Sequence, residues 1–263
     1  MKNLIINSFA TKTNLTENID EKGDDIISEF SHQNNNNNNE PKIKLIDTYH
    51  PSYETMQSDY IYIGNKVVHD ALCDDIINYY EIYKKNTRDG VTTGGVNKNI
   101  KNTTDITFFM ENENTFFSKI FKTISEIIFQ NVEKWNTNLK KMNQHANVEI
   151  SFMDKHLFLP TGILCQKYKK NSGFYIYHHD FNLLKDYSYR VITFIIYLND
   201  VLEGGETEFF GNIKIKPRRG RIVLFPASWT FPHRGIVPIS DDKYILTGWI
   251  HTDSIPVNLI KNN

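Results

Sequence analysis

The fold of this chain is decided by residues 190–225, which read RVITFIIYLNDVLEGGETEFFGNIKIKPRRGRIVLF. This stretch holds three short runs rich in aromatic and β-branched residues, separated by Asn-Asp, Gly-Gly and Pro-Arg-Arg-Gly turn signals. Similar runs precede it at residues 174–180 and follow it at residues 243–252. Many short strands at this spacing predict a sandwich or jelly roll that begins near Gly162.

Two amphipathic helices are predicted before this β-rich half. Apolar residues recur at helical spacing over residues 67–83, after a short alternating run at residues 59–63. A second helical stripe runs from Phe116 to Trp135 and is bounded by polar clusters at residues 111–114 and after Asn136. We therefore predict a mainly β (α+β) fold, a jelly roll with these helices packed outside one of its sheets.

The first part of the chain has a different composition. Residues 11–40 are polar, acidic and poor in aromatic residues, and they include a run of asparagines at residues 34–39. Such a segment cannot bury enough apolar surface to order itself, so we predict a disordered tail over residues 1–41. An asparagine tract can also self-associate, but a solvated extension is favoured. Residues 42–160 are expected to support a jelly-roll core over residues 161–263.

The bulk composition excludes several classes of partner. The chain has 30 basic and 31 acidic residues, so its charge does not indicate binding to nucleic acid or to an anionic membrane. No apolar run approaches the roughly 20 residues of a membrane helix, and the N-terminus lacks the apolar core of a signal peptide. Cys73 and Cys165 form no zinc-binding spacing and are expected to be buried, reduced thiols. These features fit a cytosolic or nuclear setting, and we expect a cytoplasmic protein.

A histidine and a carboxylate share one face of the predicted strand at residues 174–180. Side chains at i and i+2 point the same way, so His178 and Asp180 converge and His179 points to the other face. With a second histidine they would form a 2-His-1-carboxylate triad, which binds iron(II) and leaves coordination positions open. His233 is the candidate, because the β topology can return it to the same end of the fold. Alone this spacing is weak, since a distant histidine is more often structural.

A lysine shortly after His233 strengthens the pattern. Lys243 opens the predicted strand 243–252, and alternation places four of its residues on one face: Lys243, Ile245, Thr247 and Trp249. On the inner face, the ammonium of Lys243 can pair with the far carboxylate of a keto-diacid that chelates iron, a charge that is otherwise costly to bury. Considered in isolation, a lysine after the turn at residues 240–242 would instead be expected to point to solvent.

Residues 165–251 resemble the prolyl 4-hydroxylase branch of the iron(II)/2-oxoglutarate dioxygenases. In that branch tyrosines precede HxD, an arginine-led strand ends in YLND, and a GGET turn and a glycine-led LF strand follow, before His, Gly, Pro, Lys and Trp. Here the elements are Tyr168 and Tyr175, the HHD of residues 178–180, residues 190–200, 204–207 and 220–225, and then His233, Gly235, Pro238, Lys243 and Trp249. Each motif alone is weak, but several in this order are specific.

The resemblance implies a double-stranded β-helix and a set of site residues. Three residues would hold Fe²⁺: His178, Asp180 and His233. Lys243 would pair with the C5 carboxylate of 2-oxoglutarate, Tyr168 or Tyr175 would donate a hydrogen bond to this cosubstrate, and the same pocket would include Thr193 and Trp249. The implied reaction consumes O2 and 2-oxoglutarate, releases succinate and CO2 and hydroxylates a substrate, with L-ascorbate keeping the iron reduced.

A prolyl residue of a protein or peptide is the substrate that this resemblance favours. The aromatic side chains of Tyr177, Trp229 and Phe231 are candidates for a wall against the proline. The alternative substrate is a small molecule or free amino acid, and a nucleic-acid substrate is not expected. The alternative function is that of a non-catalytic jelly roll that binds a peptide or sugar.

Two further histidines, one basic run and one loop complete the set of candidate features. His179 and His251 are not expected to bind metal. The basic residues between 214 and 221 favour a solvated turn over a site for acidic substrates, and residues 88–95 form a glycine-bearing loop that is a candidate substrate lid.

Overall fold

The computed structural model describes residues 44–46, 60–109, 116–143, 157–159, 162–182 and 189–252. The chain divides into two compact units, Met1–Glu40 and Pro41–Asn263, and all described residues belong to the second. The predicted disordered tail, residues 1–41, lies outside the described residues. The other predicted domain boundaries stay predictions.

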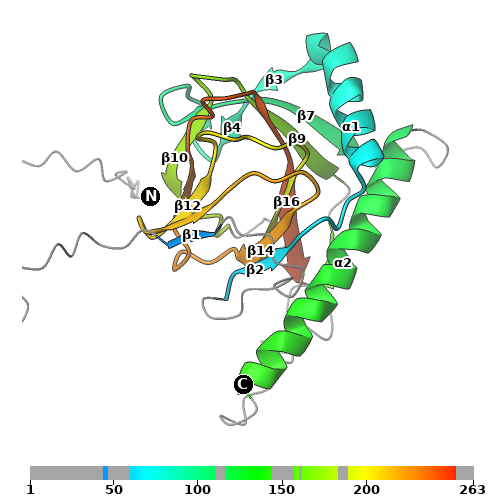
Figure 1. Ribbon diagram of the computed structural model, residues 1–263, viewed down its shortest axis with the longest axis vertical. Coiled ribbons are helices and arrows are strands. Elements are labelled where there is room, and N and C mark those ends of the chain that lie inside the picture. Colours follow the sequence, from blue (N-terminus) through cyan, green and yellow to red (C-terminus); the bar gives the residue numbers. More distant parts are fainter. Residues whose placement is uncertain are drawn as a thin grey trace, which may run out of the picture. The chain divides into compact units, whose positions relative to one another are not determined.

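Two mainly antiparallel sheets build this second unit (Figure 1). The larger has the order β2 (Tyr62–Gly64), β14 (Ile222–Pro226), β11 (Tyr189–Tyr197), β16 (Lys243–Thr252), β9 (Gly162–Tyr168), β7 (Thr104–Phe109) and β3 (Arg88–Asp89), with β8 (Leu157–Phe158) paired to β16. The smaller has the order β1 (Lys44–Ile46), β13 (Ile213–Ile215), β12 (Thr207–Phe209), β15 (His233–Gly235), β10 (Phe174–His178) and β6 (Lys101–Asn102). A separate hairpin joins β4 (Val91–Thr92) to β5 (Gly95–Val96). The predicted jelly-roll class is confirmed.

The central strands β11 and β14 are buried on both faces, which explains their nearly continuous apolar sequences. In β11, Ile195 packs between the two sheets, and its neighbours Phe194 and Ile196 pack on the opposite face of the larger sheet. In β14, Val223 points between the sheets, and Leu224 points to the other side. Because successive side chains of a strand alternate, a strand covered on both faces is apolar at every position.

Two α-helices cover the outer face of the larger sheet, as predicted (Figure 1). They are α1 (Asp70–Ile82), which a short 3₁₀ helix η2 (Lys84–Asn86) follows, and α2 (Phe116–Asn143). Helix α2 continues past the predicted end after Trp135. Leu139 lies one turn after Trp135, on the same face of the helix, and extends the apolar stripe into the same core with 2% exposure.

The turn at Gly204 and Gly205 places a backbone carbonyl oxygen next to the side chain of Lys243. Both glycines have positive φ angles, 70° and 75°, a region that residues with a Cβ rarely adopt. At Gly204 a Cβ would also collide with the carbonyl oxygen of Val237. The turn directs the carbonyl oxygen of Gly205 inward, where it accepts a 2.9 Å hydrogen bond from Lys243.

Other sequence-based expectations have clear outcomes. Cys73 and Cys165 are free and buried, as predicted. The run at residues 214–221 is not simply a solvated turn, because Arg221 is 1% exposed and its Nε donates a 2.7 Å hydrogen bond to Oδ1 of Asn65. Among the described residues, no helix has the length and apolar character needed to cross a membrane.

Candidate active site

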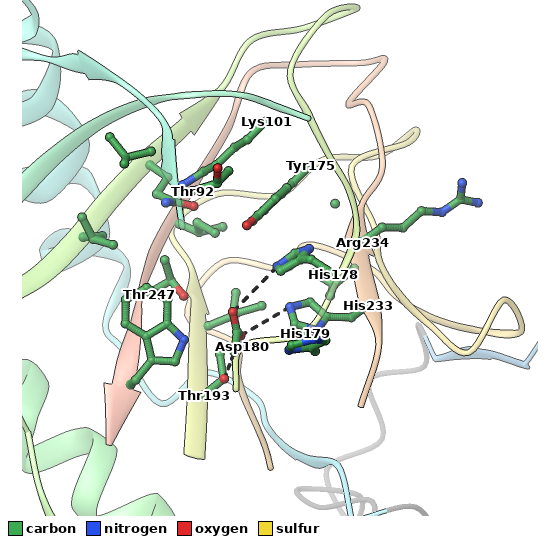
Figure 2. Close-up of a pocket in the computed structure, with 18 of the residues that line it drawn as sticks. Thr92, Lys101, Tyr175, His178, His179, Asp180, Thr193, His233, Arg234 and Thr247 are labelled. Atoms are coloured by element: carbon green, nitrogen blue, oxygen red, sulfur yellow. Dashed lines mark hydrogen bonds and ion pairs between the residues drawn. The ribbon is translucent and has the colours of Figure 1, made fainter. Parts of the chain in front are cut away.

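A cavity of about 320 Å³ lies between the two sheets (Figure 2). Strands of the larger sheet line it with Thr193, Lys243 and Trp249, and strands of the smaller sheet line it with Tyr175 and His233. The strand face predicted from alternation is turned into this cavity, since its four residues, Lys243, Ile245, Thr247 and Trp249, are all lining residues. Lys243 therefore does not point to solvent.

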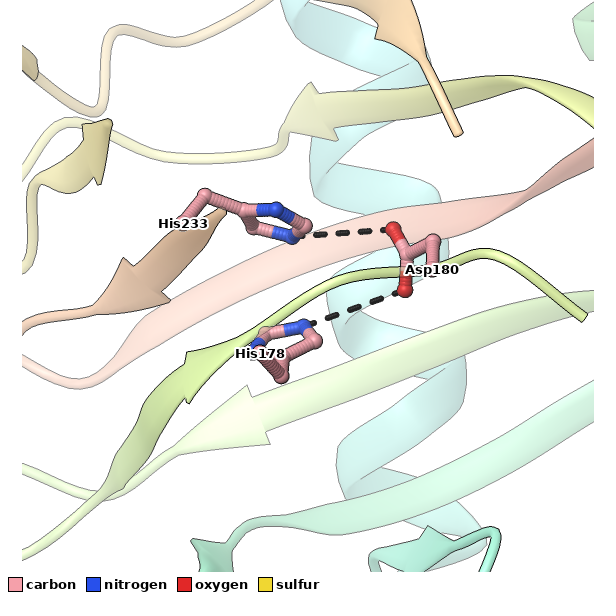
Figure 3. Close-up of side chains that lie close together, drawn as sticks. All are labelled: His178, Asp180 and His233. Atoms are coloured by element: carbon pink, nitrogen blue, oxygen red, sulfur yellow. Dashed lines mark ion pairs between the residues drawn. The ribbon is translucent and has the colours of Figure 1, made fainter. Parts of the chain in front are cut away.

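Three potential metal ligands converge in the cavity (Figure 3). His178 ends β10, Asp180 follows this strand, and His233 begins β15 directly opposite His178 in the antiparallel pairing. One side-chain ligand atom from each residue lies within 4.8 Å of the others. Strand pairing thus brings together residues that are far apart in the sequence.

Both histidines present the same ring nitrogen to the centre of this cluster. Nδ1 of His178 lies 2.8 Å from the carbonyl oxygen of Ile176, and Nδ1 of His233 lies 3.1 Å from that of Phe231. A carbonyl oxygen only accepts, so each Nδ1 carries a proton and donates it. In the neutral ring Nε2 then keeps its lone pair, and the two Nε2 atoms lie 3.8 and 3.6 Å from the carboxylate oxygens of Asp180.

The protonation states of the cluster suit a divalent metal. Burial, followed by the nearby His233, lowers the pKa of His178 to about 3, so its imidazole is neutral. Burial by itself raises the pKa of Asp180, but His233, His178 and a hydrogen bond from Thr193 together bring it below its ordinary value. Two imidazoles and one carboxylate are the donor set of the iron(II) facial triad.

Lys243 is a buried cation without an anionic partner. It is 1% exposed, and its Nζ donates to the carbonyl oxygen of Gly205 and lies 3.9 Å from the ring centroid of Tyr168. No carboxylate among the described residues comes within salt-bridge distance of it. Burial lowers its pKa to about 7, against an opposing effect from Glu206. A buried ammonium of this kind is costly unless a ligand supplies the counter-charge.

The two candidate tyrosines occupy different positions. Tyr168 contacts Lys243 and packs closely on Gly235, where an added Cβ would lie 2.9 Å from its Cε1. Tyr175 stacks on His178 with ring centroids 3.5 Å apart. Both line the cavity, Tyr168 next to the lysine and Tyr175 next to the metal-ligand cluster.

Thr193 and Trp249 lie beside the carboxylate of Asp180. Oγ1 of Thr193 donates a 2.8 Å hydrogen bond to Oδ2 of Asp180. Trp249 contributes to the lowered pKa of Asp180, and its ring stacks at 3.5 Å on the guanidinium of Arg190. Both residues line the cavity, as expected, but Thr193 directs its hydroxyl to a candidate metal ligand.

The predicted aromatic wall for a proline is wrong. Tyr177, Trp229 and Phe231 are not among the described residues that line the cavity. Tyr177 points to the opposite face of its strand, where its hydroxyl donates to Glu208, because alternation separates it from His178. Trp229 is 68% exposed.

The two histidines that were not expected to bind metal, His179 and His251, are not part of the metal-ligand cluster. His179 is exposed at the rim of the cavity, whereas His251 is buried against Phe158. Neither joins the cluster of potential ligands.

Several lining residues were not singled out from the sequence. Residues 88–95, the predicted lid loop, form β3 and the first part of the β4–β5 hairpin, whose Val91, Thr92 and Thr93 reach the cavity. Lys101, Gln166 and Arg190 also line it. Gln166 shares a strand face with Tyr168 two positions later, a signal that could have identified it. Lys101 has no such signal.

The fold and the cavity together define the class of a non-haem iron oxygenase built on a jelly roll. Residues 163–251 match the family model of the 2OG-Fe(II) oxygenase superfamily. The resemblance read from the sequence motifs is therefore confirmed at the level of the superfamily, and this segment is a 2OG-Fe(II) oxygenase domain. The superfamily implies a dioxygenase that uses Fe²⁺, 2-oxoglutarate and O2.

Solved structures of prolyl hydroxylases share this fold. A prolyl hydroxylase from Trichoplax adhaerens, in complex with a peptide fragment of the hypoxia inducible factor oxygen degradation domain, has a TM-score of 0.56 at 19% identity, covering 74% of this chain and 84% of that one. A viral collagen prolyl hydroxylase from Paramecium Bursaria Chlorella virus-1, in its 2OG complex, has a TM-score of 0.50 at 21% identity, covering 74% and 97%. At these identities the likeness shows the fold. No curated protein sequence matches the chain.

Proposed function

We propose that this chain hydroxylates a prolyl residue of a protein or peptide, with 2-oxoglutarate as cosubstrate and release of succinate and CO2. The observation that carries this proposal is Lys243, a buried ammonium without a carboxylate partner in the cavity that also holds the cluster of potential metal ligands. A dicarboxylate that reaches from the cluster to the lysine would satisfy both.

The metal would be held by His178, Asp180 and His233, whose Nε2 lone pairs and carboxylate form a suitable donor set. Bound Fe²⁺ would supply the activation of O2, coupled to decarboxylation of 2-oxoglutarate, that the superfamily implies. Thr193 would act as a positioning residue, since its hydroxyl fixes one oxygen of Asp180. L-Ascorbate would restore the reduced metal after turnovers without substrate.

The protein's contribution to cosubstrate binding would come from Lys243 and its neighbours. The ammonium would pair with the C5 carboxylate and would hold its proton once that charge is present. Tyr168 covers the lysine and excludes water from it. Its hydroxyl is the better placed of the two candidate tyrosines to donate to the same carboxylate, because Tyr175 stacks on His178 instead.

A peptide substrate is supported by the similar proteins. One of them was solved with a peptide fragment, and the other is described as a collagen prolyl hydroxylase. A proline ring would enter the part of the cavity between the candidate metal site and the β4–β5 hairpin.

A free amino acid is the second candidate substrate, and Arg190 is the observation that favours it. The guanidinium of Arg190 lines the cavity and forms no ion pair with the described residues. An unneutralised arginine is suited to a substrate carboxylate.

Succinate release tests the proposed reaction. Protein loaded with Fe²⁺ under argon is mixed with 2-oxoglutarate and air-saturated buffer that contains either a library of proline-containing peptides or free L-proline. We expect succinate that depends on both Fe²⁺ and 2-oxoglutarate, and a +16 mass shift in a peptide. A shift in free proline alone would select the second candidate. Succinate formation that persists in Asp180→Ala would contradict the proposed site.

A further inference from the structure

A second polar cluster, made of residues other than the candidate metal ligands and Lys243, lies in the wall of the cavity. Nζ of Lys101 on β6 lies 3.1 Å from Oδ2 of Asp105 on β7, and Nε2 of Gln166 on β9 donates to the same oxygen at 3.0 Å. All three residues are at most 5% exposed. Lys101 and Gln166 reach the cavity surface, and Asp105 lies behind them.

Stability does not explain this buried ion pair. Removing two charges from water usually costs as much as their attraction returns, so an apolar pair of similar size would hold the strands together equally well. The ammonium of Lys101 has three N–H donors, but within the described part of the chain it makes one hydrogen bond, to Asp105. Donor capacity therefore remains on the cavity side of Lys101.

Lys101 stands one aromatic ring away from the candidate metal ligands (Figure 2). Its Nζ lies 5.3 Å from the ring centroid of Tyr175, and the same ring stacks on His178. The root of the β4–β5 hairpin covers the alkyl chain of Lys101, since a Cβ at Gly90 would lie 2.8 Å from its Cε. The ammonium is thus held beside Tyr175, whose ring packs on a candidate metal ligand.

The charge balance indicates which group Lys101 would bind. Asp105 already neutralises Lys101, so the pair carries no net charge. A substrate carboxylate at this position would meet the buried Asp105 as a like charge, whereas a carbonyl oxygen would accept a hydrogen bond at no such cost. A neutral acceptor therefore fits the cluster better than an anion.

We propose that Lys101 is a specificity-determining residue that donates a hydrogen bond to a backbone carbonyl next to the hydroxylated residue of a peptide substrate. This inference rests on the proposed function. Asp105 and Gln166 act as positioning residues that hold the ammonium against the cavity wall. Lys101 would thereby favour a substrate residue within a peptide chain over a free amino acid. A free amino acid has only its carboxylate as an acceptor for the hydrogen bond from Lys101.

Anaerobic binding of peptide tests this role separately from turnover. Protein loaded with Fe²⁺ and 2-oxoglutarate under argon is titrated with the fluorescein-labelled library peptide that wild type binds most tightly, and free L-proline is titrated in parallel. Lys101→Met is expected to raise the peptide Kd about tenfold or more, with a smaller change for L-proline. The Kd for 2-oxoglutarate, measured by calorimetry, should not rise together with the peptide Kd in this variant.

Two further variants keep this test decisive. Lys101→Met alone leaves Asp105 unpaired and risks misfolding, so the double variant Lys101→Met, Asp105→Asn removes both charges together and should show the same loss of peptide binding. Lys98→Met is the matched control, because Lys98 is a surface lysine of the same segment, 61% exposed and paired with Asp89.

Three results would overturn the inference. The first is equal peptide affinity in the folded double variant and wild type, and the second is a larger loss for L-proline than for peptide. The third is peptide that does not bind wild type at all. Peptide that binds through Lys101 but is never hydroxylated would instead reject the proposed function and leave Lys101 as a peptide-binding residue.

Discussion

The hydroxyl of Thr193 donates a 2.8 Å hydrogen bond to Oδ2 of Asp180, the carboxylate oxygen that faces Nε2 of His233 at 3.6 Å. Thr193 belongs to β11 of the larger sheet, whereas Asp180 directly follows β10 of the smaller one. One sheet therefore orients a potential metal ligand that extends from the other. Such outer partners restrict the rotation of a carboxylate and keep it ionised.

Removing this hydroxyl should weaken metal binding. Thr193→Val keeps the shape of the side chain, and we expect metal affinity to fall by about 10- to 100-fold, measured by competition of Fe²⁺ or Co²⁺ with a chromophoric chelator. Thr247→Val is the matched control, since Oγ1 of Thr247 lines the same cavity but donates to the carbonyl oxygen of Phe194. Equal losses in both variants would mean that Asp180 does not depend on Thr193.

The two adjacent histidines offer a direct test of the metal site. His178→Ala removes a neutral Nε2 donor from the cluster and should abolish tight binding of Fe²⁺. His179→Ala removes an exposed ring at the cavity rim and should leave the metal Kd within about twofold. Both are measured in the same chelator competition. Metal lost in His179→Ala and retained in His178→Ala would reverse the assignment.

Much of this site could be predicted from local sequence rules. Strand alternation predicted that His178 and Asp180 share a face and that Lys243 shares one with Thr247 and Trp249, because a period of two holds wherever a strand is regular. The inward orientation of Lys243 followed only from the need for a counter-charge to a keto-diacid and from the family resemblance. The motif order then indicated a partner for this pair, His233. These are relationships along one strand or between motifs, and the sequence carries them directly.

Other parts of the site depend on pairing between distant strands. Lys101 reaches the cavity because β6 pairs with β10, placing Lys101 opposite Tyr175, and no short-range pattern encodes this register. An irregularity between Tyr175 and His178 in the pairing of β10 with β15 lets both residues face the cavity although they are three positions apart. The aromatic wall failed for the opposite reason, since alternation alone turns Tyr177 outward.

Replacing Lys243 should separate stability from cosubstrate binding. Lys243→Met removes a buried ammonium that has no carboxylate partner in the described residues, so the free energy of unfolding of the ligand-free protein should rise by about 1–3 kcal/mol at pH 7. The Kd for 2-oxoglutarate should rise by about 100-fold. Urea unfolding and calorimetry measure the two quantities, with Lys98→Met as the control. Lower stability together with unchanged affinity would show that the lysine is structural.

Closer packing around Tyr168 should perturb 2-oxoglutarate binding without removing Lys243. A Cβ at residue 235 would lie 2.9 Å from Cε1 of Tyr168, so Gly235→Ala should displace this ring from Lys243. We expect weaker 2-oxoglutarate binding and a loss of stability of about 1–3 kcal/mol from overpacking. Gly211→Ala is a poor control because the φ angle of Gly211 is positive. Gly94→Ala is a better control, because a Cβ there would meet only Oγ1 of Thr92, at 3.9 Å; it should leave 2-oxoglutarate binding unchanged.

Affinity for 2-oxoglutarate should fall as the pH rises above neutrality. Burial lowers the pKa of Lys243 from 10.5 to about 7 in the ligand-free protein, so above pH 7 the bound dicarboxylate must restore a proton to the lysine. The Kd should then increase by up to about tenfold per pH unit. The unfolding free energy of the ligand-free protein should rise by up to about 1.4 kcal/mol per pH unit between pH 7 and 10.5. In this range the unfolded chain holds a proton on Lys243 that the folded chain lacks. Calorimetry in buffers of different ionisation enthalpy would count the proton taken up, and Lys243→Met should remove this uptake. A Kd that is constant from pH 7 to 9 would mean that Lys243 is already charged before the cosubstrate arrives.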